Sequence, residues 1–151
     1  MFSYWFYKIY FLCKKDKIEK KKIFSFEGYK TYALVTNIYD GDTFTIAFRK
    51  NGTLLKVKCR AYGYDSPEMR PSLQKPNRDK EIEEAKNAKN YLIELLQEYN
   101  NLIYVELLGF DKYGRTLIKF YTPKKKLSIN ELMIKNTQSK PYFGGKKENH
   151  F

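Results

Sequence analysis

The chain has 151 residues, a formal net charge of +12 and 17% aromatic residues. This length predicts one domain with a single core and no second catalytic module. The two cysteines, Cys13 and Cys59, cannot form a disulfide framework, and the only histidine is His150, next to the C-terminal residue. A Ser-His-Asp triad and a histidine-ligated zinc site are therefore effectively excluded. We expect Cys59 to be a buried thiol in a strand.

The positive charge is concentrated at the two ends of the chain. Residues 1–30 carry 8 lysines against 3 acidic residues, and residues 122–151 carry 7 against 2, whereas residues 31–121 hold 14 basic and 12 acidic side chains. Basic flanks around a nearly neutral body suit a polyanionic partner such as DNA or RNA. Solvated lysine tails explain the charge equally well.

Residues 1–12 are apolar and aromatic, but Lys8 interrupts them and they are shorter than the roughly 20 apolar residues that span a bilayer. They also lack the basic start and small-residue cleavage site of a secretory signal. The sequence therefore does not favour a membrane tether by residues 1–12, and slightly favours an intracellular protein. A strand or helix packed on the body and a weak interfacial anchor both stay open. Residues 14–22 are a charge run, typical of a linker or arm.

The folded body is predicted to begin near Tyr29. Residues 31–39 and 43–48 have the composition and alternation of strands, with residues 40–42 as the turn between them. Asn51-Gly52 is a hairpin turn leading into a strand over residues 54–62. In that strand one side shows Val57, Cys59 and Ala61, and the other shows Lys56, Lys58 and Arg60.

Further along the chain, residues 70–79 contain two prolines and predict a surface loop. Apolar residues recur at helical spacing from Ile82 to Tyr99, which predicts a long amphipathic helix. Strands are expected at 102–108 and 116–121, around a turn at 111–115. Ser128 and Glu131 form a capping box that starts a second, short helix.

Three strands, a helix, two strands and a helix fit an α+β, mainly β fold: an OB-fold five-stranded barrel with two or three helices. Counting elements alone leaves other α+β folds open.

Three short blocks contain the residues of most chemical interest: Asp40-Gly41-Asp42-Thr43, Arg60 to Glu68 with the end Asp65-Ser66-Pro67-Glu68, and Asp111-Lys112-Tyr113-Gly114-Arg115. Each alone is typical of ordinary turns and surface charges. Together they supply hard oxygen ligands, an extra carboxylate and two arginines, which metal-assisted attack of water on a phosphodiester requires. In order and spacing the blocks resemble the thermonuclease (staphylococcal-nuclease-like) family over about residues 31–143.

The resemblance implies a role for each matching residue. Asp42 and Asp65 look like direct metal ligands, with the Ser66 backbone carbonyl as a third, and Asp40 would act through water. Arg60 and Arg115 would stabilise the charge on the reacting phosphate, and Glu68 would orient or deprotonate the attacking water. Lys112 and Tyr113 would contact a neighbouring phosphate. Tyr142 or Phe143 would stack on a base, although a buried aromatic is an equally good interpretation of either.

Composition and the resemblance together set the expected domain limits. We expect residues 1–28 to form an arm without a counterpart in the family, residues 29–143 an OB-fold nuclease domain, and residues 144–151 a basic tail. The resemblance also implies a function. We expect a monomeric endonuclease without an implied protein partner, which uses Ca²⁺ in preference to Mg²⁺. It would cleave single-stranded or frayed DNA, with RNA also open, at low sequence specificity, leaving 3′-phosphates. The alternative is a non-catalytic OB-fold nucleic-acid-binding module, which has no reason to gather carboxylates that repel its ligand. Gly63 and Tyr64 depart from the family's aliphatic strand end, and we expect this to affect packing only.

Overall fold

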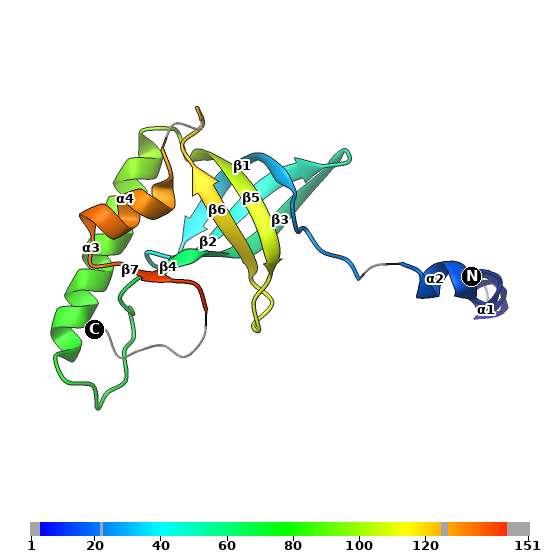
Figure 1. The fold of residues 1–151 in the computed structure, drawn as a ribbon, viewed down its shortest axis with the longest axis horizontal. Helices are drawn as coiled ribbons and strands as arrows, with labels where there is room; N and C mark the ends of the chain where they lie inside the picture. The colour runs from blue at the N-terminus through cyan, green and yellow to red at the C-terminus, as the bar shows by residue number, and fades with distance from the viewer. Residues whose placement is uncertain (1–3, 22, 125–126, 145–151) are drawn as a thin grey trace.

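Five strands close into a barrel in this computed structural model, which describes residues 4–21, 23–124 and 127–144 (Figure 1). The strands are β1 (Lys30–Ile38), β2 (Thr43–Lys50), β3 (Thr53–Ala61), β5 (Leu102–Phe110) and β6 (Thr116–Tyr121). Their order around the barrel is β1-β2-β3-β6-β5. Only the β3–β6 pair among them is parallel. A closed, mixed, five-stranded barrel with a few helices is consistent with the predicted OB-like barrel.

The barrel interior is filled by alternate residues of the strands, as the period of two requires. Phe44, Ile46 and Phe48 of β2 point inward, and β3 contributes Cys59 at its end. Cys59 is fully buried, as predicted, and burial raises the pKa of its thiol to about 12. At the far end of the β2–β3 hairpin, Asn51 and Gly52 both have positive φ, which confirms the predicted turn.

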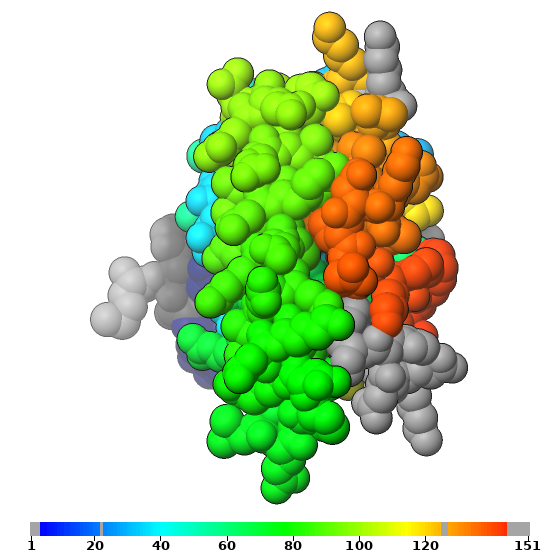
Figure 2. All heavy atoms as spheres, turned by 90° about the vertical axis from the view of Figure 1, so that its left-hand side faces the viewer, coloured from blue at the N-terminus to red at the C-terminus, as the bar shows by residue number. Residues whose placement is uncertain are grey.

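Two helices pack together beside one end of the barrel, α3 (Arg78–Gln97) and α4 (Ile129–Asn136) (Figures 1 and 2). Helix α3 buries Ala85, Ala88, Leu92 and Leu96 along one stripe, and it starts four residues before the predicted Ile82. Helix α4 starts at the predicted capping box, because the Ser128 hydroxyl oxygen accepts a hydrogen bond from the Glu131 amide at 3.3 Å.

A second, two-stranded sheet was not predicted. It pairs β4 (Gly63–Asp65) with β7 (Lys140–Tyr142) in antiparallel register, with Asp65 opposite Lys140. Three-residue strands are too short for an alternation pattern to identify. This sheet returns the chain after α4 to the end of β3, and it fixes the segment that contains Asp65.

The N-terminal helices α1 (Tyr4–Cys13) and α2 (Lys15–Glu19) lie away from the barrel at the end of an extended segment (Figure 1). Neither helix contains a buried residue, so neither packs on the body as the sequence left open for residues 1–12. The packed core begins at Phe26, which is 6% exposed and contacts Phe48 edge-on. This is three residues before the expected start. Within the described ranges, no helix is long and apolar enough to cross a membrane. His150 and all of the predicted basic tail except Gly144 lie outside the described residues.

Candidate active site

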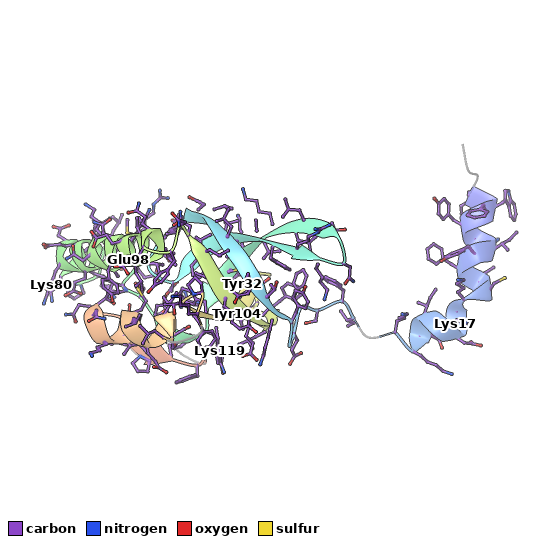
Figure 3. All side chains as sticks on the ribbon, turned by 90° about the horizontal axis from the view of Figure 1, so that it is seen from above. Lys17, Tyr32, Lys80, Glu98, Tyr104 and Lys119 are labelled. Carbon is purple, nitrogen blue, oxygen red and sulfur yellow. The ribbon has the colours of Figure 1, made fainter. Side chains whose placement is uncertain are left out.

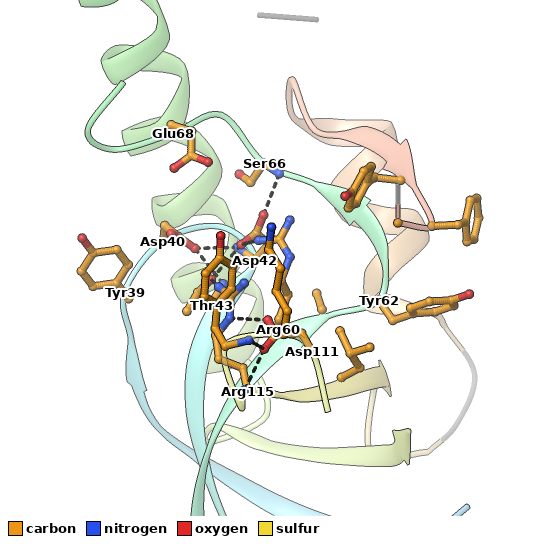
Figure 4. A pocket seen from close by; sticks show the side chains of 17 residues that line it. Tyr39, Asp40, Asp42, Thr43, Arg60, Tyr62, Ser66, Glu68, Asp111 and Arg115 are labelled. Atoms are coloured by element: carbon orange, nitrogen blue, oxygen red, sulfur yellow. Dashed lines mark hydrogen bonds and ion pairs between the residues drawn. The ribbon is translucent and has the colours of Figure 1, made fainter. Parts of the chain in front are cut away.

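The three sequence blocks meet at one pocket of about 1000 Å³ at the end of the barrel (Figure 4). The register of the sheet brings them together, because Arg60 of β3 lies opposite Thr43 on one side and Leu117 of β6 on the other. All the predicted site residues except Asp65 line this pocket: Asp40, Asp42, Arg60, Ser66, Glu68, Lys112, Tyr113, Arg115, Tyr142 and Phe143. Asp65 lies next to it, in contact with Arg60.

The turn between β1 and β2 is held by the side chain of Asp40. Its Oδ1 atom accepts hydrogen bonds from the amides of Asp42 at 3.1 Å and Thr43 at 2.7 Å. Gly41 is required by a close approach, since a Cβ atom there would lie 2.2 Å from the Ser66 hydroxyl oxygen and 3.1 Å from the Cβ of Ala88. The turn thus packs closely between the segment after β4 and helix α3. This packing directs the side chain of Asp42 into the site.

The side chain of Tyr64 stabilises this turn by a buried hydrogen bond. Its ring is completely buried, and its hydroxyl donates a 2.6 Å hydrogen bond to the carbonyl oxygen of Gly41. Burial raises the pKa of this phenol well above its ordinary value. From the sequence, Tyr64 was expected to affect packing only. Its hydroxyl could have indicated more, because a buried tyrosine hydroxyl usually has a hydrogen-bond partner.

Arg60 bridges the two carboxylates that the family resemblance assigns to the metal. Its Nη1 atom lies 2.5 Å from Asp42 Oδ1, and its Nη2 atom donates to Asp65 Oδ1. The second oxygen of Asp42 accepts from the Ser66 amide at 2.9 Å. Arg60 was expected on an outward basic stripe, but at the strand end neighbouring segments cover its side chain to 12% exposure.

The group around Asp42 has an excess of negative charge. Burial, Asp40 and Asp65 raise the pKa of Asp42, Arg60 and the Ser66 amide lower it, and the net result is a pKa of about 7. Three carboxylates, those of Asp40, Asp42 and Asp65, thus lie around the single guanidinium of Arg60. The buried hydroxyl of Ser66 has no hydrogen-bond partner among the described residues. Hard oxygen donors with excess negative charge suit a calcium or magnesium ion.

In the described part of the chain, no three His, Cys, Asp or Glu side chains are grouped to hold a metal ion. A cation at Asp42 and Asp65 would thus need backbone or water oxygens as well.

The second arginine is oriented by a different carboxylate. Arg115 Nε donates to Asp111 Oδ2 at 2.7 Å, and its Nη1 donates to the Thr43 hydroxyl at 3.1 Å. The same hydroxyl donates to Asp42 Oδ1 at 2.9 Å. Thr43 therefore connects Asp42 to Arg115. Thr43 and Asp111 belong to the three sequence blocks, but neither residue was predicted to have a role.

Asp111 also organises the β5–β6 turn. Its Oδ1 accepts from the amides of Tyr113 and Arg115, both at 2.9 Å. Burial acts to raise the pKa of Asp111, but the hydrogen bonds from Arg115 and Tyr113 outweigh burial and lower it. The carboxylate stays ionised and can hold the Arg115 guanidinium in one orientation.

Glu68 is exposed and lies at the pocket wall formed by the loop after β4 (Figure 4). Its backbone amide lies 3.4 Å from an oxygen of Glu81, whose other oxygen pairs with Lys75 at 2.8 Å. Glu81 is 3% exposed on the otherwise apolar face of α3, which helical periodicity did not predict. This buried carboxylate ties the Glu68 loop to the helix.

Several aromatic side chains line the pocket. Tyr113 is 72% exposed, with Lys112 Nζ 5.0 Å from its ring centroid. Phe143 is 69% exposed and meets Tyr62 edge-on at 5.8 Å, so the buried interpretation is wrong for Phe143. Tyr142 is half-buried. Tyr62, not among the predicted site residues, extends this aromatic rim, and aromatic surfaces of this kind can stack on unpaired bases.

The arrangement combines two guanidinium groups, an exposed carboxylate and a buried carboxylate pair around one pocket. Such a set can bind a phosphate and a hard cation, and can accept a proton from water. No family model matches the chain, and a search of curated proteins finds no match.

Proposed function

We propose that this protein is a metal-dependent endonuclease of the thermonuclease family, with a staphylococcal-nuclease-like fold. It hydrolyses single-stranded or frayed DNA, and RNA as a further substrate, with little sequence specificity. The observation that supports this best is the meeting of Arg60, Arg115 and Glu68 with the buried Asp42–Asp65 pair at one pocket. A binding module alone does not need buried carboxylates beside its ligand.

The proposed cation is Ca²⁺, held by the carboxylates of Asp42 and Asp65 and the backbone carbonyl of Ser66, with Asp40 acting through water. When bound, such an ion supplies Lewis-acid stabilisation of a phosphate oxygen. Calcium is favoured over magnesium because two carboxylates, a carbonyl and waters form a loose shell, whereas magnesium requires strict octahedral geometry.

The protein's own side chains perform the remaining steps. Arg115, held by Asp111 and Thr43, donates N–H groups to oxygens of the reacting phosphate. Arg60 donates from the side of the carboxylate pair, so the two forks stabilise charge as it develops. Glu68 orients the attacking water or accepts its proton. The water oxygen bonds to phosphorus as the bond from phosphorus to the 5′-oxygen breaks. The 5′-oxygen takes a proton from solvent water, and the phosphate stays on the 3′-oxygen.

The exposed rim binds the rest of the strand. Lys112 and Tyr113 contact a neighbouring phosphate, and Tyr142 or Phe143 stacks on a base. Phe143 is the better placed of the two, because more of its ring is exposed and it forms a continuous surface with Tyr62.

The test is a gel assay on 5′-labelled single-stranded DNA with calcium, with magnesium and with chelator. We expect cleavage with calcium, weaker cleavage with magnesium and none with chelator. Product ends should accept a polymerase only after phosphatase treatment, because they carry 3′-phosphates. Arg115→Ala should lower turnover about 100-fold, whereas Arg49→Ala, an exposed arginine on the distant hairpin, should leave it unchanged.

Cleavage at full rate in chelator would eliminate the metal mechanism. DNA binding without cleavage under every ion condition would instead favour the OB-fold binding module.

A further inference from the structure

Helix α1 exposes an unusual number of large apolar side chains. Eight of its ten residues are large apolar or aromatic residues with 45% to 72% of their surface exposed: Tyr4, Trp5, Phe6, Tyr7, Ile9, Tyr10, Phe11 and Leu12. Figure 3 shows these side chains projecting around a helix that stands apart from the barrel. Exposed apolar surfaces of this size usually mark an interaction site.

The length and composition of α1 fit the surface of a bilayer and not its interior. Ten helical residues extend about 15 Å, about half the hydrocarbon thickness of a membrane. Tyrosine and tryptophan prefer the boundary between lipid and water, where the ring is buried and its polar atom stays hydrated. The single charge, Lys8, can extend from a helix lying in that boundary to the headgroups.

A basic segment follows α1 directly. Residues 14–21 contain the lysines Lys14, Lys15, Lys17, Lys20 and Lys21 against Asp16 and Glu19, and all of them are exposed. Lysines beside an inserted apolar segment attract anionic lipid headgroups. The two segments supply the two signals, apolar insertion and positive charge, that stable peripheral binding needs.

We propose that residues 4–21 bind the surface of an anionic lipid membrane, with α1 lying in the interface and the lysines of residues 14–21 on the headgroups. The sequence did not favour a membrane tether by residues 1–12, but it left a weak interfacial anchor open, and the structure favours that alternative. The reason is that α1 folds as a helix with no buried residue. Nucleic acid would match the lysines but would not need four consecutive aromatic residues and further apolar residues around the same helix. The proposal does not depend on the nuclease activity.

The full-length chain contains its own reporter, because Trp5 is its only tryptophan. Tryptophan fluorescence is recorded during titration with phosphatidylcholine vesicles, with and without phosphatidylserine. We expect a blue shift and co-sedimentation with the phosphatidylserine vesicles, weakened by salt, and at least tenfold weaker binding to phosphatidylcholine alone.

Two variants separate the apolar and the charged contributions. Phe6→Gln with Phe11→Gln should abolish the blue shift, while Leu54→Gln with Leu73→Gln, exposed leucines of the body, should not. Changing Lys14, Lys17, Lys20 and Lys21 to Gln should weaken binding several hundredfold, at about fivefold per lysine. The same change of charge at Lys86, Lys89, Lys124 and Lys135 of the body should have little effect.

Absence of binding to either vesicle type would overturn the proposal. So would a Trp5 blue shift produced only by single-stranded DNA, or only by raising the protein concentration. A shift with DNA alone would mean that residues 4–21 bind nucleic acid. A shift with protein concentration alone would mean that they contact a second copy of the chain. Equal loss of vesicle binding in the arm and body lysine variants would also overturn it.

Discussion

The guanidinium of Arg60 lies between the carboxylates of Asp42 and Asp65 and bonds to both. All three side chains are nearly buried, so each depends on the others for charge balance. Arg60 therefore has two possible uses: it compensates the carboxylate pair, and it is a fork within reach of a phosphate in the pocket. These two uses compete unless another positive charge joins the carboxylates.

Arg60→Ala should destabilise the protein in chelator by about 3 kcal/mol, because it leaves two buried carboxylates without their partner. If the carboxylates bind calcium, added calcium should raise the melting temperature of Arg60→Ala more than that of the wild type. Thermal denaturation in chelator and in calcium measures both effects. Arg49→Ala, on the exposed hairpin, is the control. Equal stability of Arg60→Ala and wild type in chelator would contradict the bridging arrangement.

Glu68→Gln should leave stability within about 0.5 kcal/mol of wild type, because the side chain is exposed. Turnover should fall about 100-fold or more, since glutamine cannot accept a proton from water. Single-turnover kinetics on labelled DNA, together with a denaturation curve, give both numbers. Glu83→Gln, an exposed glutamate of α3, should change neither. A Glu68→Gln variant that cleaves at the wild-type rate would remove Glu68 from the mechanism.

Much of the fold could be predicted from the sequence. Alternation of apolar residues predicted the barrel strands, Asn51-Gly52 predicted a turn with positive φ, and Ser128 with Glu131 predicted the start of α4. These signals are local, so they depend on few long-range contacts. The family resemblance of the three blocks also predicted a shared site, and their residues do line one pocket.

What the sequence could not provide depends on contacts between distant segments. Alternation placed Arg60 on the outer face of β3, but only the folded chain shows that the strand end is covered by Asp42 and Asp65. Glu81 breaks the apolar pattern of its helix because Lys75, six residues before it, neutralises it. The hydroxyl of Tyr64 finds its partner at Gly41, 23 residues away.

Tyr64→Phe tests the buried hydrogen bond that stabilises the turn at Gly41. The change removes only a hydroxyl, and it leaves the buried carbonyl of Gly41 without that donor. We expect a loss of about 1–3 kcal/mol in the free energy of unfolding, measured by urea denaturation. Tyr32→Phe is a matched control, because its hydroxyl bond to Pro123 is exposed and should be worth little. The Gly41 turn would have another source of rigidity if both variants proved equally stable.

Asp111→Asn tests the carboxylate that orients Arg115, through the dependence of stability on pH. Hydrogen bonds from Arg115 and Tyr113 overcome burial and lower the pKa of Asp111 below its ordinary value of 3.8. The folded state therefore binds this proton more weakly than the unfolded state. The stabilising effect of the ionised Asp111 carboxylate is complete well above pH 3.8 and is lost as the pH falls through the folded-state pKa.

Wild type should thus be more stable than Asp111→Asn at neutral pH, and the difference in stability should shrink in acid. Denaturation curves from pH 7 to pH 3 measure it, with the fully exposed Asp79→Asn as the control. A difference that stays constant over this range would show that the ion pair with Arg115 does not depend on the charge of Asp111.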